Sequence, residues 1–311
     1  MPLTSVLHWA AISLLNGSLA WLVGALFVRM WISGSEGTWT DSVLRRLDFS
    51  FFVACIICGV GSIANLWIAA AAMGDVPLSD ASEAFQTMLT STSYGRLGLY
   101  GLVLLTALAL FYAFYSNPRN RQAQTWLIGL LLGAFMFTRA ASSHAAEGGV
   151  FRLAVAIDWL HIAFMACWVG IVLVSGFVAL PRAQLRPLPD RHVTQRFLLS
   201  LSTTATVALI GILATGVYNA YHGLRNLEDL VSTTWGQALT VKLCLIAVAV
   251  ALGGYNRFAG FPAVLDETDK EQFLKAGMER LKTVLYVEAA LLVGAVVAAA
   301  VLASEVAPTV S

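Results

Sequence analysis

The chain has 311 residues, of which 58% are hydrophobic and 12% charged, and its formal net charge is +1. Because water-soluble domains carry about 25% charged residues, this composition excludes a soluble globular protein. The basic residues form no patch, so the sequence gives no support to a nucleic-acid partner.

Long apolar segments follow one another from one end of the chain to the other. Eight of them are long enough to cross the hydrocarbon core of a bilayer as helices, at residues 6–31, 49–73, 96–115, 123–140, 153–179, 197–220, 237–256 and 283–303. We therefore expect an all-α integral membrane protein with eight transmembrane helices, surrounded by membrane lipid.

The lysines and arginines near the ends of these segments predict the orientation. Fourteen of the nineteen lie around the loops after the first, third, fifth and seventh segments, and four lie on the opposite side. Because basic residues concentrate in cytoplasmic loops, we expect both termini on the outer side, which is the periplasm in a bacterium. The first segment lacks the basic start of a cleavable signal peptide. The expected location is the bacterial inner membrane.

Parts of the chain resemble each other. Leu89–Gly95, before the third segment, and Leu230–Gly236, before the seventh, are identical at four of seven positions. A second echo joins His8 and His161, each of which lies nine residues before a glycine of its segment. An even number of spans per half keeps both halves in the same orientation, related by an axis along the membrane normal. We therefore expect two parallel four-helix halves, which are residues 1–140 and 141–311.

The longest predicted cytoplasmic loop covers residues 257–282. Apolar residues recur there at helical spacing among charged ones, at Phe273, Leu274, Met278 and Leu281. This pattern predicts an amphipathic helix that lies on the inner membrane surface.

The histidines are unevenly distributed. Four of the five fall on the predicted outer side of the membrane, and these are His8, His144, His161 and His222. Histidine is costly to place near hydrocarbon, so several on one face indicate a metal or cofactor site. Asp158 lies three residues before His161 and shares its helix face, and Met165 lies one turn further into the membrane.

These residue types are compatible with copper. Imidazole binds copper, zinc, iron and nickel, and a thioether such as that of Met165 favours Cu(I). Asp158 either binds the metal or accepts the second ring N–H of His161 and fixes its tautomer. Imidazole and carboxylate also bind Cu(II), so the oxidation state stays open. The competing interpretation is that the histidines are amphipathic side chains at the interface, and it is strongest for His222, beside two tyrosines.

Two charged residues lie inside predicted spans, where charge is costly unless it is paired or functional. Lys242 lies near the outer end of the seventh segment, and its expected partner is Glu228 or Asp229 in the preceding loop. Glu288 lies near the inner end of the eighth segment, at the wrong depth to pair with Lys242. Glu288 is a candidate for proton or ion passage.

The sequence contains no Walker loop, dinucleotide fingerprint, zinc-protease motif or nucleophile elbow. We therefore expect that the chain is not an enzyme. Cys55 and Cys58 form a C-x-x-C pair inside an apolar segment, where cysteine usually behaves as a small hydrophobic residue. A Cu(I) relay is the alternative for this pair.

Taken as a set, the motifs of the second half resemble those of the copper-resistance D (CopD) family of inner-membrane proteins. The motifs are His144-Ala-Ala, Asp158-Trp-Leu-His161, Cys167-Trp-Val-Gly170, Ala214-Thr-Gly-Val-Tyr-Asn219, Thr233-Thr-Trp-Gly236 and Gly254-Tyr-Asn-Arg257. The resemblance covers about 144–257 closely and the first half loosely. It implies copper uptake from the periplasm into the cytoplasm, contributing to copper homeostasis or resistance. It also implies a separate periplasmic copper-binding partner of the CopC type, and copper ligands at His144 and His161 with Asp158 beside them.

Two other functions stay open. His8 and His161 on facing helices are able to ligate a haem axially, as in a membrane b-type cytochrome. A copper sensor or docking scaffold that binds the metal without transporting it also fits the sequence.

Overall fold

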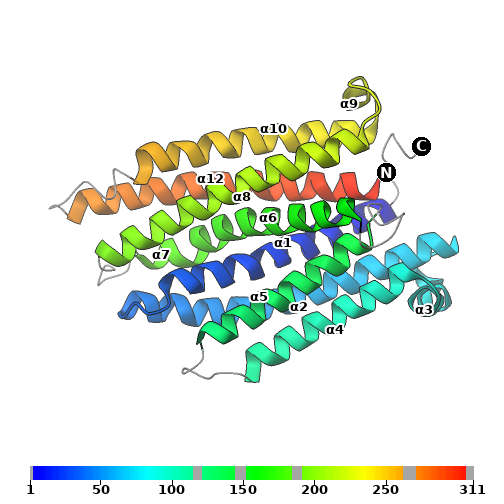
Figure 1. Cartoon of the computed structure of the whole chain (residues 1–311), viewed down its shortest axis with the longest axis horizontal. Helices are drawn as coiled ribbons and strands as arrows, with labels where there is room; N and C mark the ends of the chain where they lie inside the picture. The colour runs from blue at the N-terminus through cyan, green and yellow to red at the C-terminus, as the bar shows by residue number, and fades with distance from the viewer. Residues whose placement is uncertain (1–2, 115–120, 144–151, 184–190, 262–270, 306–311) are drawn as a thin grey trace.

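The computed structural model describes residues 3–114, 121–143, 152–183, 191–261 and 271–305. Every regular element in these residues is a helix, and the long helices run side by side as a bundle (Figure 1). The two chain termini lie at the same end of this bundle, which we call the termini end (Figure 1).

The first half of the chain contributes four long helices. They are α1 (Leu3–Ile32), α2 (Thr38–Gly74), α4 (Ser93–Phe114) and α5 (Arg121–Ala141), with a short 3-10 turn, η1 (Leu78–Asp80), and a short helix, α3 (Ser82–Ser91), between α2 and α4.

The second half contributes four more long helices, two of which continue into a π-helical turn. The elements are α6 (Leu153–Val174) with η4 (Ser175–Ala179), α7 (Leu180–Ala183), α8 (Arg191–Gly223), α9 (Asp229–Ser232), α10 (Thr234–Tyr255) with η5 (Asn256–Gly260), and α12 (Glu271–Ser304).

Seven helices in the described residues are long and apolar enough to cross a membrane. They correspond to seven of the eight predicted segments. The remaining segment, 123–140, forms α5, a helix of 21 residues that packs beside α4 and α6. It is not among the seven, and polar residues of the sequence Arg-Gln-Ala-Gln-Thr occupy its first turns.

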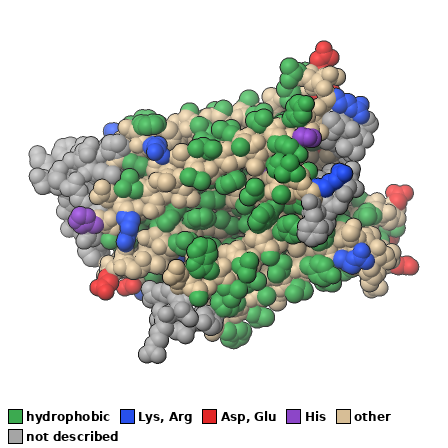
Figure 2. Space-filling model, viewed as in Figure 1, with side chains coloured by type: hydrophobic (Ala, Val, Ile, Leu, Met, Phe, Trp, Pro, Cys, Tyr) green, Lys and Arg blue, Asp and Glu red, His purple; other side chains and the backbone are tan. Residues whose placement is uncertain are grey.

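The side chains on the bundle surface fit a membrane environment. Figure 2 shows hydrophobic side chains across the middle of the bundle and charged ones gathered toward its two ends. Large apolar residues such as Leu130, Ile210 and Val217 are more than 60% exposed. Water would make such a surface unfavourable, whereas lipid chains cover it without cost.

The helices α1 and α6 form the centre of the bundle. In the most apolar membrane-spanning stretch of each helix, 67% of the residues are buried in α1 and 72% in α6 with η4. The corresponding share in α10 with η5 is 11%. The backbones of α1 and α6 meet at two glycines: a Cβ added to Gly24 would lie 2.1 Å from the carbonyl oxygen of Gly170. A Cβ on Gly170 would lie 1.9 Å from the carbonyl oxygen of Ala20. Small residues allow this close approach, which stabilises helix pairs in membranes through van der Waals contact.

The other long helices surround this central pair. Within the first half α2 packs on α1, and within the second half α8 packs on α6. Across the halves, α12 packs on α1 and α5 packs on α6. The outer pairs α4 with α5 and α10 with α12 complete the bundle.

The two similar sequence stretches form the same local structure. Thr92 Oγ1 accepts the backbone N–H of Gly95 at 3.0 Å and donates to the carbonyl of Met88. Thr233 Oγ1 likewise accepts from Gly236 at 3.0 Å and donates to the carbonyl of Asp229. In both stretches the glycine lies against the backbone of the preceding short helix, α3 or α9, where a Cβ would not fit.

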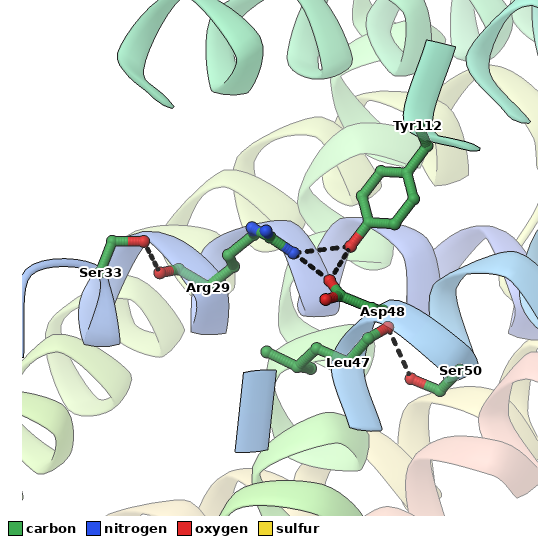
Figure 3. Close-up of polar contacts among 6 residues, drawn as sticks. All are labelled: Arg29, Ser33, Leu47, Asp48, Ser50 and Tyr112. Carbon is green, nitrogen blue, oxygen red and sulfur yellow. Dashed lines mark hydrogen bonds and ion pairs between the residues drawn. The ribbon is translucent and has the colours of Figure 1, made fainter. Parts of the chain in front are cut away.

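The end of the bundle opposite the termini is held by a polar triad in the first half. The Arg29 guanidinium pairs with Asp48 and also donates to the Tyr112 hydroxyl at 2.7 Å (Figure 3). The Tyr112 hydroxyl donates in turn to Asp48 at 2.5 Å, and its ring stacks on Phe51. These contacts join the ends of α1, α2 and α4, because each helix contributes one of the three polar groups.

The prediction of a separate surface helix within 257–282 was wrong. Residues from Glu271 onward belong to α12, which continues without a break to Ser304. Met278 and Leu281 are buried in the main core rather than facing a membrane surface. Their apolar spacing marks the side of α12 that packs into the bundle.

The contact between α1 and α6 predicts that Gly24→Ala destabilises the protein. The added methyl group meets backbone atoms that have no rotamer to move away, so we expect a loss of about 1–3 kcal/mol or more. Gly17→Ala is the matched control, since no atom lies within 4 Å of its Cβ position on the same helix. Unfolding in mixed detergent micelles measures both variants, and equal stability for the two would contradict the contact.

Candidate functional site

Five of the six predicted copper ligands lie in the described residues, and His144 lies outside them. The five are His8 on α1, Asp158, His161 and Met165 on α6, and His222 at the end of α8. All the elements that carry them reach the termini end of the bundle (Figure 1).

His161 is half-buried and held by a partner on the neighbouring helix α8. Its Nδ1 lies 2.9 Å from Thr215 Oγ1, and that hydroxyl donates its own proton to the carbonyl of Gly211 at 2.6 Å. Because the hydroxyl proton is used, His161 Nδ1–H is the donor to Thr215. The lone pair of the neutral ring is then on Nε2, which is the arrangement of a metal-binding histidine with its outer-shell partner. Gly216 lies against the His161 ring: a Cβ atom added to this glycine would lie 3.4 Å from Cε1 of His161.

His8 is held in a similar way in the first half, but through its other nitrogen. His8 Nε2 lies 3.1 Å from Asn65 Oδ1 on α2, which only accepts hydrogen bonds, so Nε2 carries the proton. Asn65 is buried and donates through Nδ2 to the Tyr94 hydroxyl on α4 at 3.1 Å. The lone pair of the neutral His8 ring is therefore on Nδ1.

Asp158 shares the face of His161 one turn nearer the termini. Ser143, two residues after the end of α5, donates to Asp158 Oδ2 at 2.9 Å. Two cationic side chains act electrostatically on Asp158, Arg139 from α5 and Lys242 from α10. Among the described residues no ion pair joins Lys242 to Glu228 or Asp229, so the structure does not show the predicted pairing with the loop before α10.

Asp229 has a different role from the predicted one. Its Oδ2 accepts the backbone N–H groups of Arg225 and Asn226, and so closes the turn before α9.

His222 has the contacts of an interface residue. It is exposed, its Nδ1 lies 2.9 Å from the carbonyl oxygen of Tyr218, and its ring lies against those of Tyr218 and Tyr221. Met165 is half-buried and packs against the main apolar core.

The predicted ligands that lie in the described residues do not converge into a single cluster. No group of three or more His, Cys, Asp or Glu side chains in the described ranges is close enough to share a metal ion. His8 and His161 lie at different depths, because Gly170 packs between Ala20 and Gly24 rather than beside Gly17. At 1.5 Å per residue, His8 lies roughly 8 Å nearer the termini than His161.

A small cavity with a mostly apolar lining lies beside Asn65, the hydrogen-bond partner of His8, in the first half. Its polar lining is Ser62, Asn65, Tyr94, Thr138, Arg139 and Ser142. Its volume is about 20 Å³, which is enough for a water molecule. Arg139 also acts electrostatically on His8. Arg139 acts in the same way on Asp158, so its charge does not distinguish the His8 side from the Asp158–His161 face as a metal site.

The cysteines of the C-x-x-C pair are both buried in the main core between α1 and α2. Cys58 Sγ is placed 4.0 Å from the carbonyl oxygen of Leu15. This environment is that of packing residues.

Several residues of the site were not found from the sequence. Thr215, Asn65, Tyr94 and Arg139 act through contacts between helices, and helical periodicity does not specify such partners. Thr215 was nevertheless inside one of the motifs that carried the family resemblance, Ala214–Asn219.

Two family models match the chain. "Copper resistance protein D-like, N-terminal domain" matches residues 3–153, and "Copper resistance protein D" matches residues 191–302. Together the two models cover most of the sequence. Asp158, His161 and Met165 lie between the matched segments, so the matches by themselves assign these residues no role.

Three known proteins resemble the chain. Inner membrane protein YebZ of Escherichia coli is 28% identical over 58% of this chain and 59% of its own length. Copper resistance protein D of Pseudomonas syringae is 27% identical over 67% of each. Copper transport protein CutJ of Bacillus subtilis is 28% identical over 50% of this chain and 28% of its own length. No solved structure matches the chain significantly.

The chain belongs to the copper-resistance D family of membrane proteins, as its sequence motifs predicted. It is a multi-pass inner-membrane protein of a family that handles copper.

The hydrogen bonds predict the tautomers of the two half-buried histidines, His8 and His161. In the neutral state His161 carries its proton on Nδ1, because Thr215 accepts it, and His8 carries its proton on Nε2. Nitrogen-15 NMR of histidine-labelled protein at mildly alkaline pH distinguishes the two. Thr215→Val should release the preference of His161 and leave that of His8 unchanged. An Nε2–H tautomer of His161 in the unmodified protein would contradict the assigned geometry.

Proposed function

We propose that this member of the copper-resistance D family moves copper ions from the periplasm into the cytoplasm. The observation that carries the proposal is the face of α6 that presents Asp158 and His161, with His161 fixed by Thr215 and its Nε2 lone pair available. The choice of copper as the metal rests on the family assignment, since relatives of the chain include proteins named for copper resistance and copper transport. The matched regions span only part of two of these relatives, so their activities serve here as a hypothesis.

We further propose that all eight long helices cross the membrane as two related halves, 1–140 and 141–311, with both termini in the periplasm. The shared Thr–Gly structures before α4 and α10 support the repeat. So does the helix arrangement, in which α1, α2, α4 and α5 make contacts largely matched by those of α6, α8, α10 and α12. The excess of lysine and arginine at the end opposite the termini supports the orientation.

Copper would first bind at the termini end. Asp158 and His161 are the proposed ligands on α6, and His144 is the proposed third ligand from the preceding loop. His8 would belong to the path by which copper arrives, since it lies nearer the termini than His161. We assign no ligand role to His222 or Met165, because the first stacks on tyrosines and the second packs into the core.

Lys242 would control when copper occupies the site. The ammonium group would balance the carboxylate charge of Asp158 when no metal is bound. An arriving copper ion takes over that role and repels the ammonium. Binding of copper and withdrawal of Lys242 are therefore coupled by simple electrostatics.

For copper to move between the two halves, the contact between α1 and α6 at Gly24 and Gly170 would have to open. The backbones of α1 and α6 touch at Gly24 and Gly170, which leaves no space for an ion between them at that crossing. The absence of a nucleotide motif from the sequence leaves an ion gradient or a cytoplasmic copper acceptor as the driving force. We propose no enzymatic activity, and a soluble CopC-type protein as the periplasmic copper donor.

The remaining alternatives are separated by experiment. A scaffold or sensor would bind copper without moving it, and a b-type cytochrome would be purified with haem. The structure gives the cytochrome no specific support, because His8 and His161 lie at different depths and each is bonded to a partner within its own half.

Copper binding and accumulation test the proposed function together. We expect about one copper ion per chain in purified protein, lost in His161→Ala, and higher cellular copper with the unmodified protein than with this variant. His192→Ala is the matched control, since His192 lies at the opposite end of α8 from Thr215. Copper binding without any increase in cellular copper would contradict transport and favour the function of a copper-binding scaffold or sensor.

Removing the partner of His161 gives a graded test. Thr215→Val keeps the shape of the side chain but removes the hydroxyl that orients the ring, and such changes weaken metal binding about 10- to 100-fold. Thr203→Val on an exposed face of the same helix is the control. Isothermal titration with copper measures both, and equal affinities would show that Thr215 does not position a ligand.

A further inference from the structure

A second polar constellation lies inside the bundle, on the side of the Gly24–Gly170 contact away from the termini. Its centre is Glu288 on α12, which is only 3% exposed. The carboxylate has the indole of Trp168 on α6 as its polar neighbour. On the other side, Oε1 lies 3.4 Å from the Cβ position of Gly253 on α10, so the glycine leaves the space that the carboxylate occupies.

Two further buried polar side chains lie on the helices beside it. Asn256 is 2% exposed and Ser175 is 0% exposed. In the described residues, neither the Oδ1 nor the Nδ2 atom of Asn256 has a hydrogen-bond partner. The Ser175 hydroxyl also has none there. Buried polar groups are nearly always bonded to protein or to ordered water, so these three atoms indicate a bound molecule.

Both residues begin a π-helical turn. Ser175 is the first residue of η4 and Asn256 is the first residue of η5, and both turns pack against α12. Single π-turns interrupt the regular backbone pairing of a helix and occur frequently at functional sites.

The three side chains are offset along the bundle. Asn256 lies one turn beyond Gly253, in the direction away from the termini. The Cβ position of Gly176, next to Ser175, is 3.9 Å from Cβ of Leu285, which is one turn before Glu288 on α12. Asn256 and Ser175 therefore lie about one turn from the carboxylate, between it and the far end of the bundle.

The charged and titratable groups around Glu288 are occupied elsewhere. Arg257 of η5 donates to Ser202 and Thr206 on α8. On α12 itself, Lys282 pairs with Glu279 at 2.7 Å, and the ring of Tyr286 stacks on Phe177.

On α6, Cys167 is buried among apolar residues, and on α1, Arg29 pairs with Asp48. No cationic side chain in the described part of the chain neutralises the Glu288 carboxylate. An isolated carboxylate in such a place is costly and marks ion or proton pathways in membrane proteins.

We propose that Glu288 is a proton-binding site inside the membrane, reached from the end opposite the termini through water held by Asn256 and Ser175. The proton binds a carboxylate oxygen from that side and leaves by the same way. Directly bound sodium would need several oxygens around the ion, whereas Asn256 and Ser175 lie a turn away. Resting on the proposed function, we add that an arriving copper ion replaces the proton at the carboxylate, and no electron moves.

Infrared spectroscopy tests the proton site without copper. In proteoliposomes taken through a pH titration, we expect a carboxylic-acid C=O band that is missing in Glu288→Gln and present in Glu279→Gln, an exposed matched control. Asn256→Leu should keep the band but slow its response to a pH jump several-fold. An unchanged band in Glu288→Gln would overturn the proposal, and a band displaced by sodium at constant pH would overturn the assignment to a proton.

Copper uptake into the same vesicles tests the link to transport. With orientation determined from a C-terminal tag, we expect the uptake rate to vary several-fold with pH on the side opposite the tag, and Glu288→Gln to lose this dependence. Retention of the dependence in Glu288→Gln would overturn the link. Absence of copper uptake in the unmodified protein would instead refute the proposed function, and the infrared result would still decide the proton site.

Discussion

The contact between α1 and α6 is the constraint on which the rest of the structure depends. Hydrophobic burial drives helices together only weakly in lipid, so close backbone packing has to supply much of the attraction. Gly24 and Gly170 supply it at the centre of the bundle, where any larger residue would separate the two helices. The depth of Asp158, His161 and Glu288 relative to the first half follows from this one crossing.

Polar groups occupy two levels around that crossing. Toward the termini, each half-buried histidine is bonded to a side chain on a neighbouring helix of its own half, Asn65 for His8 and Thr215 for His161. Away from the termini, Glu288 has the Trp168 indole as a polar neighbour, and no cationic side chain in the described part of the chain pairs with it. The first level has nitrogen donors suited to copper, and the second has oxygen groups suited to a proton. A transporter requires this kind of division, with a binding site on one side of a closed contact and a charge-compensating group on the other.

Much of this fold is predictable from the sequence, because long apolar segments have few alternatives in a membrane. The shared face of Asp158 and His161 also follows from their spacing of three residues. The partners Thr215 and Lys242 do not follow, since contacts between helices leave no periodic trace. The start of α12 was misread for a related reason: Met278 and Leu281 have the spacing of an amphipathic helix, and only the neighbouring helices decide whether that face meets lipid or protein.

Copper X-ray absorption on the loaded protein tests the central claim most directly, because it identifies the atoms bound to the metal. We predict nitrogen and oxygen neighbours with the outer-shell scattering of an imidazole ring, and loss of the imidazole signal in His161→Ala. A first shell made only of sulfur would place the metal at the cysteines or methionines in the core and would contradict the account.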